Sequence, residues 1–295
     1  MKRTVLFALL LLAAAALIGC GTNSTTSTAS QSLQTTLDNQ TGYFDFGASD
    51  AETTGGVTVL QTSGESYSWY RHFGSPANPT YTIVSQDSAN ALVKVVRSVE
   101  GTLYYHLTPG SMKRIKYFNQ EVTRYAQLTS ADSGKTWSLA QLSPAVAKSV
   151  KQTPTLGVGS VPCDVTISKV VLSSDGAVIA EVTVEASANG PWFDLSALPK
   201  VRRGSTLEVT VYAAATGGYK PLVYLWPSLK TVFRAPLNNE SPAGVFAGTA
   251  GLLVVPSTET TGIKQLYVGV FNSGTLSDTT SPYDYGGWHL LYQVE

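Results

Sequence analysis

The two cysteines have the most versatile chemistry in this chain, and they lie far apart, at Cys20 and Cys163. Cys20 stands where an apolar run gives way to a stretch rich in Ser and Thr. A cysteine at such a boundary can end a membrane helix, form half of a disulfide, or carry a covalent group. The residues that precede it decide among these three roles.

The segment that ends at Cys20 has the layout of a signal peptide. Lys2 and Arg3 form a positive n-region, and residues 5–18 contain no polar side chain. That apolar run is 14 residues long, whereas a helix needs about 20 to cross a bilayer. The length therefore indicates the h-region of a signal peptide rather than a transmembrane helix.

The four residues Leu17-Ile18-Gly19-Cys20 resemble the lipobox of bacterial lipoproteins. This resemblance implies that residues 1–19 are removed and that Cys20 becomes a lipidated N-terminus carrying acyl chains such as palmitate. Several acyl chains attach a protein durably, because each buried CH₂ contributes about 0.8 kcal/mol. In Gram-negative lipoproteins, Gly21 rather than Asp after the cysteine favours the outer membrane. We therefore expect the folded part to lie outside the cytoplasm, anchored to the cell envelope.

Residues 20–40 are dominated by Ser, Thr, Gln and Asn. Such a stretch buries too little apolar surface to offset the entropy of ordering it, so we predict an unordered tether. As a flexible coil of about 20 residues it would reach roughly 25 Å.

Cys163 is the one thiol left if Cys20 is acylated, so the sequence predicts no intramolecular disulfide. It begins a predicted strand, which favours burial as a small hydrophobe. An intermolecular bridge and a reactive thiol are the alternatives. His72, His106 and His289 have no metal-ligand spacing, and we expect structural roles for them, with His106 and His289 on an outward or interdomain strand face.

Local motifs for nucleophilic or phosphate chemistry are missing from the sequence. Gly157-Val158-Gly159-Ser160-Val161 approaches the Gly-x-Ser-x-Gly elbow but ends in Val161. A catalytic triad assembled from distant strands stays open, because triads follow no fixed order. Neither a Walker A loop nor a dinucleotide fingerprint is present. The sequence therefore predicts no cofactor and favours a non-enzymatic protein.

Two groups of carboxylates lie close together in sequence. One contains Asp45, Asp50 and Glu52, and the other contains Asp278 and Asp284. Carboxylate oxygens suit Ca²⁺, but neither group has an EF-hand pattern or a dense acidic loop. We therefore expect solvated loop carboxylates and no metal.

Aromatic residues gather at residues 67–73, at Trp192 and in the stretch that holds Tyr283, Tyr285 and Trp288. Tyr and Trp in loops are good binding anchors, because they bring a large rigid area with a polar tip. Tyr283, Tyr285, Trp288 and Trp192 are therefore the candidate contacts for a ligand or partner. Packing in the core or between domains is the alternative for the same residues.

Period-two alternation predicts three strands in the first half of the chain. We place a bulge or bend at Gly101 and a hairpin turn at Asp132-Ser133-Gly134-Lys135. Short helical turns are expected after Ser66 and Ser111. The predicted strands are residues 91–107, 122–128 and 136–142.

The order of a long strand, a second strand, a turn, Trp137-x-Leu139 and Ser143-Pro144 resembles the closing strands of NTF2-like or cystatin-like α+β folds. This resemblance implies an α+β antiparallel-sheet domain over residues 41–150. A stretch punctuated by Pro and Gly, residues 151–162, reads as a linker.

Seven short strands separated by turns predict a β-sandwich over residues 163–295. Arg203-Gly204-x-x-Leu207-x-Val209-x-Val211 and Gly262…Tyr267-x-Gly269-x-Phe271-Asn272 resemble strands of bacterial immunoglobulin-like modules. The fold class that we expect is therefore mainly β. The predicted strands are residues 163–172, 177–186, 205–214, 221–227, 244–255, 264–272 and 288–294.

Composition sets limits on function. Only 14% of the residues are charged, well below the roughly 25% of typical soluble domains. Formal net charge is zero and becomes −2 without Lys2 and Arg3, so the basic surface of a nucleic-acid binder is missing. The sequence thus predicts a lipid-anchored envelope protein that binds the membrane through its anchor and contacts another envelope protein or a glycan. An envelope hydrolase and a carbohydrate-binding module using loop aromatics are the alternatives.

Overall fold

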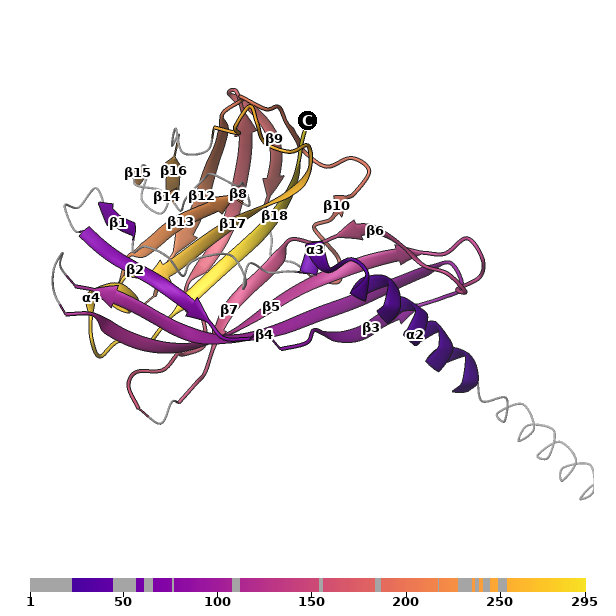
Figure 1. The fold of residues 1–295 in the computed structure, drawn as a ribbon, viewed down its shortest axis with the longest axis horizontal. Helices are drawn as coiled ribbons and strands as arrows, with labels where there is room; N and C mark the ends of the chain where they lie inside the picture. Colours follow the sequence, from indigo (N-terminus) through magenta and orange to yellow (C-terminus); the bar gives the residue numbers. More distant parts are fainter. Residues whose placement is uncertain are drawn as a thin grey trace, which may run out of the picture.

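The computed structural model describes a protein that is mainly antiparallel β-sheet, as the sequence predicts. Figure 1 shows a body formed by two sheets and a long arm of strands that extends from it, with helix α2 packed obliquely against the arm. The described residues are 23–44, 57–60, 66–75, 77–107, 112–153, 156–183, 187–216, 218–227, 235–236, 239–240, 245–248 and 254–295.

The larger sheet has 13 strands, and its main path runs in the order β1-β2-β4-β5-β7-β18-β17-β13-β14. Beside this path, β3 pairs with β4, β6 with β5, β10 with β6, and β11 with β18. The strands are β1 (Val57–Leu60), β2 (Ser66–Phe73), β3 (Thr80–Gln86), β4 (Asn90–His106), β5 (Arg114–Thr129), β6 (Ser138–Leu142), β7 (Ala145–Val150), β10 (Phe193–Asp194), β11 (Lys200–Val201), β13 (Pro221–Pro227), β14 (Ala235–Pro236), β17 (Gly262–Asn272) and β18 (Tyr285–Val294).

This sheet curls round until its two end strands, β1 and β14, come into contact (Figure 1). Side chains that point into the curl therefore meet across it. The ring of Trp69 on β2 packs edge-on against Tyr224 of β13 and Phe271 of β17, with centroids 5.0 and 4.9 Å away. These aromatic contacts fill the interior of the curl and stabilise its closed shape.

The second sheet has five strands in the order β15-β16-β12-β8-β9. Its β8–β9 hairpin turns at Asp175 and Gly176, which have φ values of 50° and 82°. Positive φ at both central residues is typical of a type I′ turn, and this turn lies between the predicted strands 163–172 and 177–186. The strands are β8 (Thr166–Ser174), β9 (Ala177–Val182), β12 (Leu207–Ala214), β15 (Asn239–Glu240) and β16 (Val245–Gly248).

Strands from both sides of residues 151–162 share the larger sheet. β7 pairs with β18 through Val146 opposite Trp288 and Ala147 opposite Gly287. The units expected at 41–150 and 163–295 are therefore joined by backbone hydrogen bonds. This pairing brings together residues about 140 positions apart in sequence, and local periodicity carries no information about it.

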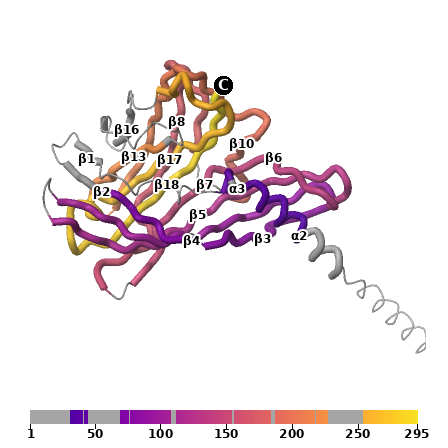
Figure 2. The backbone as a smooth tube through the Cα atoms, viewed as in Figure 1, coloured from indigo at the N-terminus to yellow at the C-terminus, as the bar shows by residue number. Residues whose placement is uncertain are grey.

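The arm consists of β3, β4, β5 and β6, and Figure 2 shows that β4 and β5 run without interruption from the body into it. Helix α2 (Asn23–Asp38) packs against one face of the arm. It contacts β6 on one side, and the Tyr81 hydroxyl of β3 donates a 2.6 Å hydrogen bond to Asp38 on the other. We call the covered side the inner face of the arm and the opposite side its outer face.

The expected unordered tether is therefore corrected for residues 23–38, which form α2. Leu33 and Leu37 are one helical turn apart, and each is only 1% exposed. A short helix, α3 (Thr41–Phe44), follows and buries Phe44. Two leucines at i and i+4 give the helix an apolar stripe that a mainly polar composition conceals.

Three local predictions in the first half are also corrected. Residues after Ser66 and Ser111 form strands β2 and β5 rather than helical turns, because each pairs along its length with β4. Of the bulge or bend expected at Gly101, the bulge is wrong, because the pairing of Gly101 with Phe118 is regular. A Cβ at Gly101 would lie 2.4 Å from the Phe118 ring and 2.5 Å from the His72 carbonyl oxygen. Glycine is required there by this close approach.

Candidate functional site

The inward face of β5 carries an unusual row of polar residues. Lys116, Gln120 and Arg124 alternate with Phe118 and Val122, and all five side chains are at most 4% exposed. Charged side chains are almost never fully buried unless each finds a partner. The partners of this row define what the interior of the curled sheet can do.

Lys116 binds the end of helix α4 (Gly274–Ser277). Its ammonium donates to three carbonyl oxygens, those of Gly274 at 3.1 Å, Thr275 at 2.6 Å and Asp278 at 2.7 Å. Burial lowers the pKa of Lys116 to about 7, and the charge of Asp278 opposes this shift. The lysine thus binds carbonyl groups at the C-terminal end of α4, where a helix leaves carbonyl oxygens exposed, and that of Gly274 also accepts from the Asp278 backbone.

Arg124 makes the equivalent contact near the other end of β5. Its guanidinium donates to the Tyr43 carbonyl oxygen of α3 and, at 3.2 Å, to the His289 carbonyl oxygen of β18. Burial lowers the pKa of Arg124 to about 10, so it remains a cation at neutral pH.

Two further side chains hold the same segment. Gln265 of β17 donates to the Gly42 carbonyl oxygen at 2.9 Å, and Arg97 of β4 donates to that of Phe44 at 3.2 Å. With Arg124, these side chains bind three successive carbonyl groups of α3. The segment that follows α2 is therefore docked against strands from both halves of the chain.

Arg71 of β2 lies inside the curl and is 4% exposed. Its guanidinium donates to the Tyr283 hydroxyl at 3.3 Å, and Gln120 donates to the same hydroxyl. Cation–π contacts of this kind favour a desolvated guanidinium. Ring centroids within 6.0 Å of the guanidinium carbon belong to Tyr285, Phe73, Trp226, Phe271 and Trp69.

The structure places three of the candidate contact residues in the core. Tyr283, Tyr285 and Trp288 are 0%, 2% and 1% exposed, so they pack as in the alternative interpretation and present no surface to a partner. The glycines at 269 and 287 leave the space that the Tyr285 ring occupies. Trp192 is half-buried and lies next to Gly190. It precedes β10 and is far in sequence from the other three residues.

His289, expected on an outward or interdomain face, is buried inside the curl at 4% exposure, beside Arg124 and Arg71 from the first half of the chain, so only the outward placement is wrong. Burial and the charges of Arg124 and Arg71 hold the pKa of His289 well below its usual value. His72 is exposed, and His106 is half-buried. Cys163 is half-buried, and its thiol lies 3.2 Å from the Val165 carbonyl oxygen. The three histidines lie on β2, β4 and β18 and form no common site.

The two carboxylates of the last loop accept hydrogen bonds from the protein itself, Asp284 in the core and Asp278 within a turn. Asp284, expected in solvent, is 4% exposed and accepts hydrogen bonds from the Asp164 backbone and the Asn272 side chain. Asp278 accepts from the backbone and hydroxyl of Thr280, which hold its pKa at about 2. Within the described part of the chain, no cluster of three or more His, Cys, Asp or Glu residues could hold a metal. The first carboxylate group, residues 45–52, lies outside the described residues.

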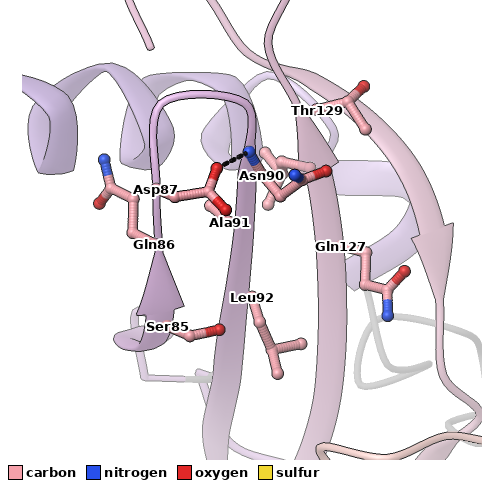
Figure 3. Close-up of a pocket in the computed structure, with 9 residues that line it drawn as sticks. Ser85, Gln86, Asp87, Asn90, Ala91, Leu92, Gln127 and Thr129 are labelled. Carbon is pink, nitrogen blue, oxygen red and sulfur yellow. Dashed lines mark hydrogen bonds between the residues drawn. The ribbon is translucent and has the colours of Figure 1, made fainter. Parts of the chain in front are cut away.

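A pocket of about 390 Å³ lies at the tip of the arm, where the β3–β4 hairpin meets β5 (Figure 3). Asp87 accepts hydrogen bonds from the backbone of Ala89 and Asn90, and so holds the hairpin turn. Leu92 and Gln127 are neighbours on adjacent strands beside it. The lining residues are Ser85, Gln86, Asp87, Asn90, Ala91, Leu92, Gln127, Leu128 and Thr129.

Sequence reasoning missed the buried cations and the arm pocket. The signal for the cations was present, because Lys116, Gln120 and Arg124 share one phase of β5 with Phe118 and Val122. A polar residue in the apolar phase of a strand indicates a buried polar contact. The pocket has no such signal, because it depends on the register of three strands.

The fold and this interior define the chain as a mainly β protein whose curled sheet encloses buried cations. Comparisons with protein-family models, curated proteins and solved structures find no match for it. Among the described residues, no helix combines the length and the hydropathy that crossing a membrane requires.

Proposed function

We propose that this chain is a lipid-anchored protein of the bacterial cell envelope with a non-enzymatic, binding or structural role. The observation that carries the proposal is the lipobox-like run Leu17-Ile18-Gly19-Cys20, which ends three residues before α2 begins. Its partners are the membrane, through the anchor, and a further envelope component.

The docking of α2 and α3 supports a structural role for the anchored segment. Leu33, Leu37 and Phe44 are buried, and Arg124 binds the α3 backbone. A 16-residue helix is about 24 Å long, so α2 would act as a strut. An anchor at Cys20 would then hold the arm close to the membrane at a defined angle.

The bonding of the reactive side chains supports a non-enzymatic role. All three ammonium hydrogens of Lys116 have carbonyl partners, and the Tyr283 hydroxyl accepts from Arg71 and Gln120. Asp284 is engaged by Asp164 and Asn272. Groups that are buried and bonded in this way stabilise the fold and are not presented to a substrate.

Lipidation is tested by expressing the wild type, Cys20→Ala and Cys163→Ala in a Gram-negative host supplied with an alkyne analogue of palmitate. We expect the label and membrane fractionation for the wild type and for Cys163→Ala, which is the matched cysteine control. Cys20→Ala should lose both. Unchanged labelling and fractionation of Cys20→Ala would contradict the proposal.

A further inference from the structure

The outer face of the arm carries a row of residues in register across five strands. Ser85 of β3 pairs with Leu92 of β4, and Leu92 pairs with Gln127 of β5. Gln127 pairs with Gln141 of β6, which pairs with Asp194 of β10. Paired residues on neighbouring antiparallel strands point to the same face. At about 4.8 Å between strands, the row is about 19 Å long.

The row lies on the outer face because its sequence neighbours point inward. Ala91 and Val93 flank Leu92 and are buried at 4% and 1% exposure, and Ala126 and Leu128 flank Gln127 and are buried at 0% and 1%. Leu92, Gln127 and Gln141 are themselves partly exposed. Helix α2 covers the inner face, so these side chains remain accessible.

Parallel rows extend the same chemistry on both sides. Asn90, Thr129 and Ser138 form the next row toward the hairpin turn, and all three are exposed. Thr82, Lys94 and Tyr125 form the next row toward the body. Residues of the first two rows line the pocket at the arm tip, and Leu92 is one of its apolar lining residues.

We propose that this outer face binds a neutral oligosaccharide, with the pocket beside Leu92 and Gln127 as its main subsite. A sugar hydroxyl is a donor and an acceptor at once, and the carboxamides of Asn90, Gln127 and Gln141 offer both functions. Leu92 matches the apolar C–H face of a pyranose ring, and Tyr125 adds a flat aromatic surface.

The charges favour a neutral ligand over an anionic one. Asp87 is the one charged residue among the nine that line the pocket, and its carboxylate already accepts two backbone hydrogen bonds. Asp194 closes the far end of the row, and Lys94 lies in the adjacent row. An acidic polymer that followed this row would be repelled by Asp87 near one end of the row and by Asp194 at the other.

This inference rests on the proposed binding role but is independent of the lipid anchor. The full chain would be purified in a zwitterionic, sugar-free detergent and titrated calorimetrically with linear tetrasaccharides of glucose, galactose, mannose and N-acetylglucosamine. We expect one of these probes to bind. Gln127→Ala and Gln141→Ala should each weaken its affinity at least about tenfold, which corresponds to about 1.4 kcal/mol.

Gln34→Ala, on the exposed side of α2, is the matched control and should leave the affinity within about twofold. Absence of binding by all four probes at about 10 mM would overturn the proposal. Equal affinity of Gln127→Ala and the wild type would show that the sugar does not bind beside Gln127. Binding of polygalacturonate in place of the neutral probes would overturn the ligand class. Cys20→Ala should bind as the wild type does, so failure of lipidation and failure of sugar binding are distinguishable.

Discussion

At the scale of single residues, the interior is organised by cations that bind backbone carbonyl groups. Lys116 binds the end of α4, and Arg124 binds α3, eight residues further along the same face of β5. Carbonyl groups at helix ends carry partial negative charge, which compensates a buried cation. An unpaired buried charge is very costly. Each cation therefore needs the carbonyl groups of its helix, and each helix is held in place by its cation.

Lys116 gives a testable dependence of stability on pH. Its pKa is lowered from 10.5 to about 7 in the folded protein, so the unfolded state binds more protons between these values. The free energy of unfolding should therefore rise with pH from about 7 to about 10.5. The contribution of this residue is complete above the unfolded pKa and is lost as pH falls through 7.

Urea unfolding of the wild type at several pH values across this range measures that rise. Lys116→Met should be destabilised near pH 10 and should lack the component of the rise that belongs to Lys116. Lys135→Met, at an exposed turn position, should keep it. Parallel pH profiles for the wild type and Lys116→Met would contradict the assignment.

Gly101 gives a second prediction at this scale. Gly101→Ala places a methyl group against the Phe118 ring and the His72 carbonyl oxygen, and overpacking of this kind costs about 1–3 kcal/mol or more. We expect a loss of at least about 2 kcal/mol in the free energy of unfolding. Gly42→Ala, where nothing lies within 4 Å of the added Cβ, should be unchanged or slightly more stable. Equal free energies of unfolding for Gly101→Ala and Gly42→Ala would contradict the close packing of Phe118 and His72 against Gly101.

At the scale of elements, several strands were predictable from alternation, whereas β2, the first half of β5 and the N-terminal helix were not. β4, β6 and β12 lie close to their predicted positions, because alternation is a local property of the sequence. Helix α2 escaped prediction because only Leu33 and Leu37 signal its buried stripe. The sequence leaves the aromatic stretch around Tyr283 open between a binding loop and the core, because its burial depends on strands far away in sequence.

If α2 is docked as described, removing its buried side chains should lower the free energy of unfolding of the whole protein. Leu33→Ala and Leu37→Ala each remove a fully buried side chain, and such changes cost about 2–5 kcal/mol. We expect each variant to lose at least about 2 kcal/mol in urea unfolding followed by circular dichroism. Gln34→Ala, exposed on the same helix, should change stability by less than about 0.5 kcal/mol. A tether that is not part of the fold would leave all three variants as stable as the wild type.

At the scale of the whole molecule, the sequence indicated the β class and the anchor but not how the halves join. β18 lies between β7 from the first half and β17 from the second, and such non-local pairing has no local sequence signature. The curled sheet holds α3 through Arg97 and Arg124 from the first half and Gln265 from the second. A lipid anchor at Cys20 would thus be connected, through α2 and α3, to both halves of the molecule.

The intact mass of the protein isolated from the envelope tests the central claim most directly. We predict a chain that begins at Cys20, lacks residues 1–19 and carries the additional mass of a diacylglyceryl group, with or without a third acyl chain. Base hydrolysis should remove the ester-linked acyl mass. A full-length chain of 31.3 kDa, or a processed chain without acyl mass, would contradict the account.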